Sequence, residues 1–120
     1  MQPDDCYGAN PNTVGYGHWR SDIAGCVGDD ELLASKGGAY EYAVLIGANT
    51  EPNVSGDAPG EVPYASAIFL HRMSYTSSGT LKPTSGCVSI GHAELLTAMR
   101  TIDPTLAPNF AIGTRASLGG

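Results

Sequence analysis

Apolar residues gather in short runs along the chain, and most of these runs have the length and pattern of β-strands. From Tyr40 to Ile46 the residues first alternate between apolar and polar and then become wholly apolar, which predicts a strand in the middle of a sheet. Ala65 to Leu70 predicts a second strand, and Val88 to Ile90 a shorter one. A last strand is expected from Asn109 to Gly113.

The segment after Ile90 has the periodicity of a helix instead. Its apolar residues recur three or four positions apart, at Leu95, Leu96, Met99 and Ile102. This spacing predicts a helix from His92 to about Ile102 that packs one face on the sheet and ends before Pro104. One or two further helical turns are expected from Glu31 to Lys36.

The remaining stretches lack periodicity and are rich in Gly, Pro, Asn and Asp. Residues 1–30 are expected to be irregular with one short strand near Trp19, residues 49–63 to form a long exposed loop, and residues 114–120 a frayed tail. At 120 residues the chain has the size of one domain, residues 1–120. The predicted fold is therefore mostly β with one C-terminal α-helix packed on the sheet.

Composition narrows the classes of function. With 42% hydrophobic and 15% charged residues the chain has enough apolar material to fold. A formal net charge of −6, without a cluster of Lys or Arg, argues against a nucleic-acid partner. No apolar run is long enough for a transmembrane segment, and Met1 to Asp5 lacks the features of a secretory signal.

The candidate chemistry lies in His71 and Cys87. A thiol attacks as its thiolate, and an imidazole that lies close by in the fold takes up the thiol proton. The two residues are expected to meet if their strands pair antiparallel across the polar loop from Arg72 to Lys82. Gly86 permits a sharp turn before the thiol, and its amide is expected to help bind a developing oxyanion.

The sequence around these residues, SAIFLHRMSYTSSGTLKPTSGCVSI, resembles the L,D-transpeptidase family, also called the YkuD domain, of bacterial cell-wall enzymes. That family has a His, a gap of similar length and then a Ser/Thr-x-Gly-Cys signature. The resemblance covers mainly residues 66–113, and the N-terminal portion of the family has no counterpart in residues 1–30. It implies a β-sandwich of YkuD type, possibly truncated, with an open sheet edge suited to self-association.

The resemblance also implies roles for individual residues. The backbone carbonyl of Arg72 is expected to orient the imidazole of His71. Ser85 and Ser89 stand where the family usually has a His and an Asn or Arg, and they are expected to bind the substrate. The aromatic side chains of Tyr64 and Tyr75, with that of Trp19, are expected to line a groove for sugar or peptide, although at least one of them is expected to belong to the core instead.

The two remaining cysteines, Cys6 and Cys26, allow two interpretations. They form a disulfide, which would stabilise the fold by about 3 kcal/mol, or they are two free buried thiols. Their spacing and the scattered histidines match no metal-site pattern, so no metal and no cofactor is expected. A disulfide favours a location outside the cytoplasm: periplasm, cell wall or secreted.

The function implied by the resemblance is acyl transfer on peptidoglycan stem peptides through a thioester on Cys87. The sequence does not discriminate a transpeptidase from an L,D-carboxypeptidase. A different class remains open: a non-catalytic wall-binding or self-assembling module that keeps the fold. A papain-like peptidase is disfavoured because those enzymes place the Cys before the His and at the start of a helix.

Overall fold

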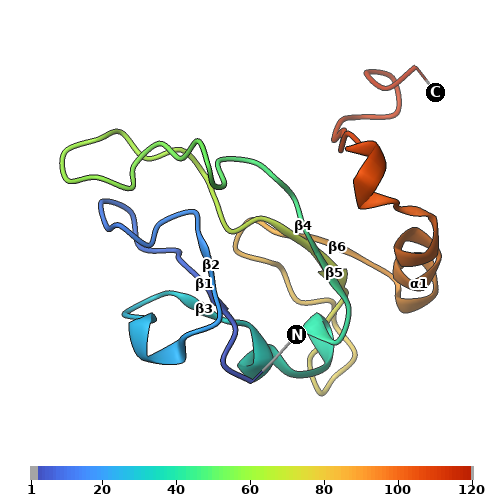
Figure 1. Ribbon diagram of the computed structural model, residues 1–120. Helices are drawn as coiled ribbons and strands as arrows, with labels where there is room; N and C mark the ends of the chain where they lie inside the picture. Colours follow the sequence, from blue (N-terminus) through green and yellow to red (C-terminus); the bar gives the residue numbers. More distant parts are fainter. Residues whose placement is uncertain (1–2, 120) are drawn as a thin grey trace.

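The computed structural model describes residues 3–119, apart from the side chain of Ile23. Two three-stranded sheets and a helix near the C-terminus form its framework (Figure 1). The first sheet has the order β2-β1-β3 and consists of β1 (Cys6–Tyr7), β2 (Trp19–Arg20) and β3 (Glu31–Leu32). The second has the order β4-β5-β6 and consists of β4 (Ala43–Leu45), β5 (Phe69–Arg72) and β6 (Val88–Ile90).

The helical elements are short apart from α1 (His92–Thr101). The others are the 3-10 segments η1 (Ile23–Gly25), η2 (Leu33–Tyr40) and η3 (Pro104–Leu106). The helix predicted at residues 31–36 is thus replaced by β3 and the start of η2. Gly37, with a φ of 62°, interrupts η2, and this left-handed conformation favours glycine. The second half of η2 therefore turns away and delivers Tyr40 to the second sheet.

Strand β5, not the run from Tyr40 to Ile46, lies in the middle of the second sheet. It pairs antiparallel with β4 and parallel with β6, so β4 is an edge strand. Self-association through such an edge stays a prediction. The strand predicted at residues 65–70 begins only at Phe69, because Ala67 has a φ of 55° and interrupts the extended backbone.

The parallel pairing of β5 with β6 corrects the antiparallel arrangement expected from the sequence. After β5 the chain makes a small hairpin, in which Tyr75 bridges to Leu81 and the Lys82 amide donates to the Ser74 carbonyl. Lys82 thus lies beside Ser74, just past the end of β5, and residues 83–87 carry the chain back to Phe69 at the beginning of β5 before β6 starts. The loop is long enough for the crossover that parallel strands require.

A cluster of aromatic and aliphatic side chains joins the two sheets. Its buried members are Tyr7, Leu33, Tyr40 and Phe69. The rings of Tyr7 and Tyr40 contact that of Phe69 edge to face, at centroid distances of 5.6 and 5.5 Å. The Tyr7 hydroxyl donates to the carbonyl of Gly17. The first sheet therefore packs, through Tyr7, against the face of β5 that carries Phe69 and His71.

The sequence predicts only one strand of the first sheet, the one near Trp19, because residues 1–30 are otherwise expected to be irregular. Cys6 in β1 forms a disulfide with Cys26, and Asp30 accepts hydrogen bonds from the amides of Ala9 and Val27. These links compensate for strands of only two residues each. The long loop from residue 49 is present, and the Asn49 side chain spans it.

Helix α1 follows β6 closely and extends to one side of the second sheet (Figure 1). Leu95 is fully buried, whereas Met99 on the predicted apolar face is 37% exposed, so the face is only partly covered. The strand predicted at residues 109–113 is absent: this segment is exposed and has no regular structure. Among residues 3–119, no helix has the length and apolar character required to cross a membrane.

Candidate functional site

Strand register places Cys87 and His71 on the same face of the second sheet. His71 lies beside Ser89, and Leu70 beside Val88. Side chains alternate between the two faces of a sheet, so Cys87 and Ser89 project to the side of His71. Both Cys87 and His71 contact Tyr40 on that face. The parallel pairing, although unexpected, brings the two candidate residues together.

The imidazole of His71 is buried and held in one orientation. Its Nδ1 lies 2.8 Å from the backbone carbonyl oxygen of Arg72. Because a carbonyl oxygen only accepts hydrogen bonds, Nδ1 carries the proton of the neutral ring and Nε2 is left with its lone pair. This is the acceptor that the family resemblance implies. The ring is therefore oriented as a base that uses Nε2.

The sulfur of Cys87 is half-buried and has three polar neighbours among the described residues. It lies 3.4 Å from the Tyr40 hydroxyl, 3.5 Å from the amide nitrogen of Phe69 and 3.6 Å from the carbonyl oxygen of Ala67. Within residues 3–119 no hydrogen bond joins the sulfur to His71. The pair thus shares a face without being in direct contact in this conformation.

Both residues border a cavity of about 200 Å³. Its charged and reactive lining consists of Glu31, Lys36, His71, Lys82, Ser85 and Cys87. Glu31 and Lys36 form an ion pair at 2.7 Å. The cavity therefore brings together a thiol, an imidazole and side chains of both signs of charge.

Gly86 gives the chain the turn that exposes Cys87. Its φ of 146° lies in the region that favours glycine. The Thr84 hydroxyl donates a hydrogen bond to the carbonyl of Cys87 at 2.6 Å and accepts one from the Gly86 amide at 3.4 Å. Binding of an oxyanion by the Gly86 amide requires release of this long contact. The role of Gly86 in binding an oxyanion stays a prediction, because its amide is engaged by Thr84 in this conformation.

Of the four predicted substrate-binding residues, two lie at the site. Ser85 lines the cavity, and Ser89 is adjacent to His71 in the register. Tyr64 lies in the long loop, is 64% exposed and does not line the cavity. Trp19 is placed in β2 of the first sheet, so these two aromatics do not form the expected groove with Cys87.

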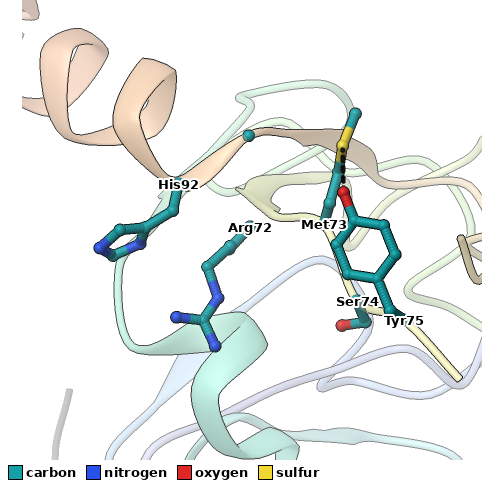
Figure 2. A pocket seen from close by; sticks show the side chains of 6 residues that line it. Arg72, Met73, Ser74, Tyr75 and His92 are labelled. Carbon is teal, nitrogen blue, oxygen red and sulfur yellow. Dashed lines mark hydrogen bonds between the residues drawn. The ribbon is translucent and has the colours of Figure 1, made fainter. Parts of the chain in front are cut away.

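Tyr75 and the Arg72 side chain border a second pocket of about 380 Å³. Figure 2 shows Arg72 and His92 among the side chains that line this pocket, and the Tyr75 hydroxyl contacts the sulfur of Met73 at 3.6 Å. Arg72 follows His71 in β5, so its side chain projects to the opposite face from the imidazole. Tyr75 therefore lies outside the cavity of Cys87.

Sequence reasoning missed Tyr40, which it assigned to a strand. Tyr40 ends η2 and is buried against Phe69, and its ring stacks on His71 with centroids 4.8 Å apart and planes inclined by 19°. Burial, and then the hydrogen bond to Cys87, raises the pKa of Tyr40 above its ordinary value. No local signal distinguishes this tyrosine from Tyr42, because its role depends on contacts with distant residues.

Comparison of the chain with protein-family models, curated proteins and solved structures finds no match. The assignment of a function therefore depends on the motif and on the geometry described above.

Proposed function

We propose that this protein is a cysteine-dependent acyltransferase of the L,D-transpeptidase type that acts on peptidoglycan stem peptides. The observation that carries the proposal is the hydrogen bond from His71 Nδ1 to the Arg72 carbonyl, which leaves Nε2 free beside the cavity that Cys87 also borders. The Ser85-Gly86-Cys87 motif and its spacing from His71 support the same class.

In the first half-reaction, Nε2 of His71 takes the proton of the Cys87 thiol. The thiolate attacks the carbonyl carbon of the bond between an L-centre and the terminal D-residue of the stem peptide. The C–N bond then breaks, and the imidazolium returns its proton to the leaving amine. The products are a thioester on Cys87 and the free D-residue. This step requires that a side-chain rotation of Cys87 bring the sulfur within hydrogen-bond reach of Nε2, and apo contacts of this kind are often loose.

Backbone amides around Gly86 and Cys87 stabilise the tetrahedral oxyanion of this step. An amide donor of this kind is typically worth about 3 kcal/mol of barrier. The Gly86 amide donates to Thr84 only over a long 3.4 Å contact. Exchange of that weak contact for a charged oxygen is favourable, because hydrogen bonds to charged groups are stronger than those to neutral ones.

The second half-reaction decides the product. An amine of a second stem peptide attacks the thioester, loses a proton to His71 and gives a cross-link, with the Cys87 thiol restored. Water in place of the amine gives a carboxylate, and the protein is then an L,D-carboxypeptidase. Stem peptides carry both carboxylates and amines. The opposite charges of Glu31 and Lys82 at the cavity suit a substrate of that kind.

The proposal places the protein outside the cytoplasm, where its substrate lies. The disulfide between Cys6 and Cys26 supports this location, because such bonds persist in oxidising compartments.

A second function, a non-catalytic wall-binding module, is favoured by one observation. The Cys87 sulfur is held by Tyr40, Phe69 and Ala67, and within residues 3–119 it has no hydrogen bond to His71. If this conformation is permanent, His71 does not deprotonate the thiol. The fold would then bind wall peptides without acylation.

Two measurements separate these functions. Incubation with a carbapenem, which acylates cysteines of this family, followed by peptide mass spectrometry is expected to give an adduct on Cys87. Incubation with a disaccharide-tetrapeptide is expected to release the terminal D-residue, and Cys87→Ala is expected to abolish this release. The disulfide-bonded Cys6 and Cys26 are the internal control for the adduct. Release that persists in Cys87→Ala contradicts the enzyme proposal.

A further inference from the structure

Tyr40 contacts both members of the proposed catalytic pair. Its hydroxyl lies 3.4 Å from the Cys87 sulfur, and its ring is stacked at 4.8 Å on the imidazole of His71. The Phe69 ring also packs against that of Tyr40 in an edge-type contact, with centroids 5.5 Å apart. Tyr40 is buried, so both contacts are made by a side chain that its neighbours hold in place.

The hydrogen bonds of the sulfur differ between its two protonation states. As a thiol, the S–H group is directed at the carbonyl oxygen of Ala67, 3.6 Å away. As a thiolate the sulfur only accepts, and two donors face it: the Tyr40 hydroxyl and the Phe69 amide. Donors to the charged form favour that form. The surroundings of Cys87 are therefore suited to hold a negative charge.

We propose that Tyr40 is a thiolate-stabilising residue of this site: its hydroxyl donates to the ionised Cys87 sulfur while its ring positions the imidazole of His71. This inference deepens the proposed function and rests on Cys87 being its nucleophile. Burial keeps the Tyr40 hydroxyl protonated, because a tyrosinate in this position would be poorly solvated. The hydroxyl therefore remains a donor well above the ordinary pKa of a tyrosine.

Other charged groups also face the cavity from each neighbouring element. Glu31 belongs to β3, Lys36 to η2, His71 to β5, and Lys82 to the segment before β6. Glu31 and Lys36 pair with each other, so their effects on the sulfur largely offset. Lys82 is exposed, and solvent screens its charge. Because the Tyr40 hydroxyl contacts the sulfur directly, its effect on the thiolate is expected to exceed those of the Glu31–Lys36 pair and of Lys82.

The test is the pH dependence of thiol alkylation in the full chain. Iodoacetamide reacts with the thiolate of Cys87, and the rate is followed by mass spectrometry from pH 5 to pH 10. In Tyr40→Phe the ring and its stacking remain and only the hydroxyl is lost. We expect the Cys87 thiol pKa to rise by about one unit and the alkylation rate at pH values below that pKa to fall about tenfold.

Tyr42→Phe is the matched control. Tyr42 lies two residues further along, is exposed, and has its ring near His92 at 6.3 Å. Its substitution is expected to leave the thiol pKa unchanged. A folded Tyr40→Phe variant with the wild-type thiol pKa overturns the inference. If that variant does not fold, 3-fluorotyrosine at position 40, a stronger donor of nearly the same shape, is expected to lower the thiol pKa, and an unchanged value overturns the inference.

Alkylation requires no substrate, so its outcome is independent of the proposed function. A raised thiol pKa in Tyr40→Phe, together with a wild-type protein that forms no carbapenem adduct and releases no D-residue, refutes the acyltransferase and keeps the role of Tyr40. If the wild-type protein releases the D-residue but wild type and Tyr40→Phe have equal thiol pKa values, the acyltransferase is kept and the role of Tyr40 is refuted.

Discussion

The imidazole of His71 lies face to face on the ring of Tyr40, with centroids 4.8 Å apart and planes inclined by 19°. The Arg72 carbonyl fixes the same imidazole from its Nδ1 side. Two independent contacts therefore restrict the ring, one through its face and one through its edge. The Nε2 atom is the part of His71 that remains available for proton transfer.

His71→Ala is expected to lower the rate of carbapenem acylation of Cys87 by about 10²- to 10⁴-fold at neutral pH, the range typical for loss of a general base. Stopped-flow fluorescence or mass spectrometry measures this rate. His92→Ala is the control, because His92 is exposed at the start of α1 and lines the other pocket. Equal losses in the two variants would show that His71 has no special role.

Gly86→Ala is expected to destabilise the fold by about 1 to 2 kcal/mol, because an L-residue is strained at the Gly86 φ of 146°. Space is not the cause, since no atom lies within 4 Å of the added Cβ. Chemical denaturation measures the free energy of unfolding. Gly47→Ala is the control: its φ is not in the strained region and its nearest atom is 3.9 Å away. An undiminished free energy of unfolding in Gly86→Ala would contradict the strain argument.

Removal of the disulfide, by the double substitution Cys6→Ala and Cys26→Ala, is expected to lower the free energy of unfolding by about 3 kcal/mol. The bond closes a loop with a sequence separation of 20 and anchors β1, which pairs with both β2 and β3. Thermal unfolding with and without a reductant checks this. Wild-type protein under reducing conditions should behave as the double variant does, and a melting temperature insensitive to reductant would refute the anchoring role.

Asp30→Asn is expected to destabilise the protein by about 1 to 2 kcal/mol at pH 7. Burial acts to raise the pKa of Asp30, but hydrogen bonds from Val27, Ala9 and Asn10 outweigh it and hold the pKa below its ordinary value. A depressed carboxyl pKa contributes stability above the pKa of the unfolded chain, and this stability is lost as the pH falls through the folded value.

The difference in free energy of unfolding between wild type and Asp30→Asn should therefore shrink as the pH is lowered from about 5 to below 3. Urea unfolding at several pH values measures it. Asp29→Asn is the control, because Asp29 is exposed and donates to Asn10 through its backbone amide, which the substitution keeps. If the difference in free energy of unfolding between wild type and Asp30→Asn is independent of pH, the Asp30 charge is not involved.

Local patterns in the sequence determined several parts of this protein. The periodicity of Leu95 and its neighbours predicted α1, and the apolar run after Cys87 predicted β6. These predictions succeeded because helices and short strands depend on residues close together in the chain. The motif around His71 and Cys87 likewise indicated the two residues that border one cavity.

Only the tertiary structure decided how these parts meet. The hairpin between Ser74 and Lys82, the return segment after it and the bend at residues 85–86 make β6 parallel to β5, and the edge position of β4 follows from the sheet order. Tyr40 reaches the sulfur across a sequence separation of 47. A contact of that range depends on loop paths and on packing around Phe69, which no local periodicity encodes. The sequence therefore indicated the candidate nucleophile and base, whereas packing selected the tyrosine that contacts both.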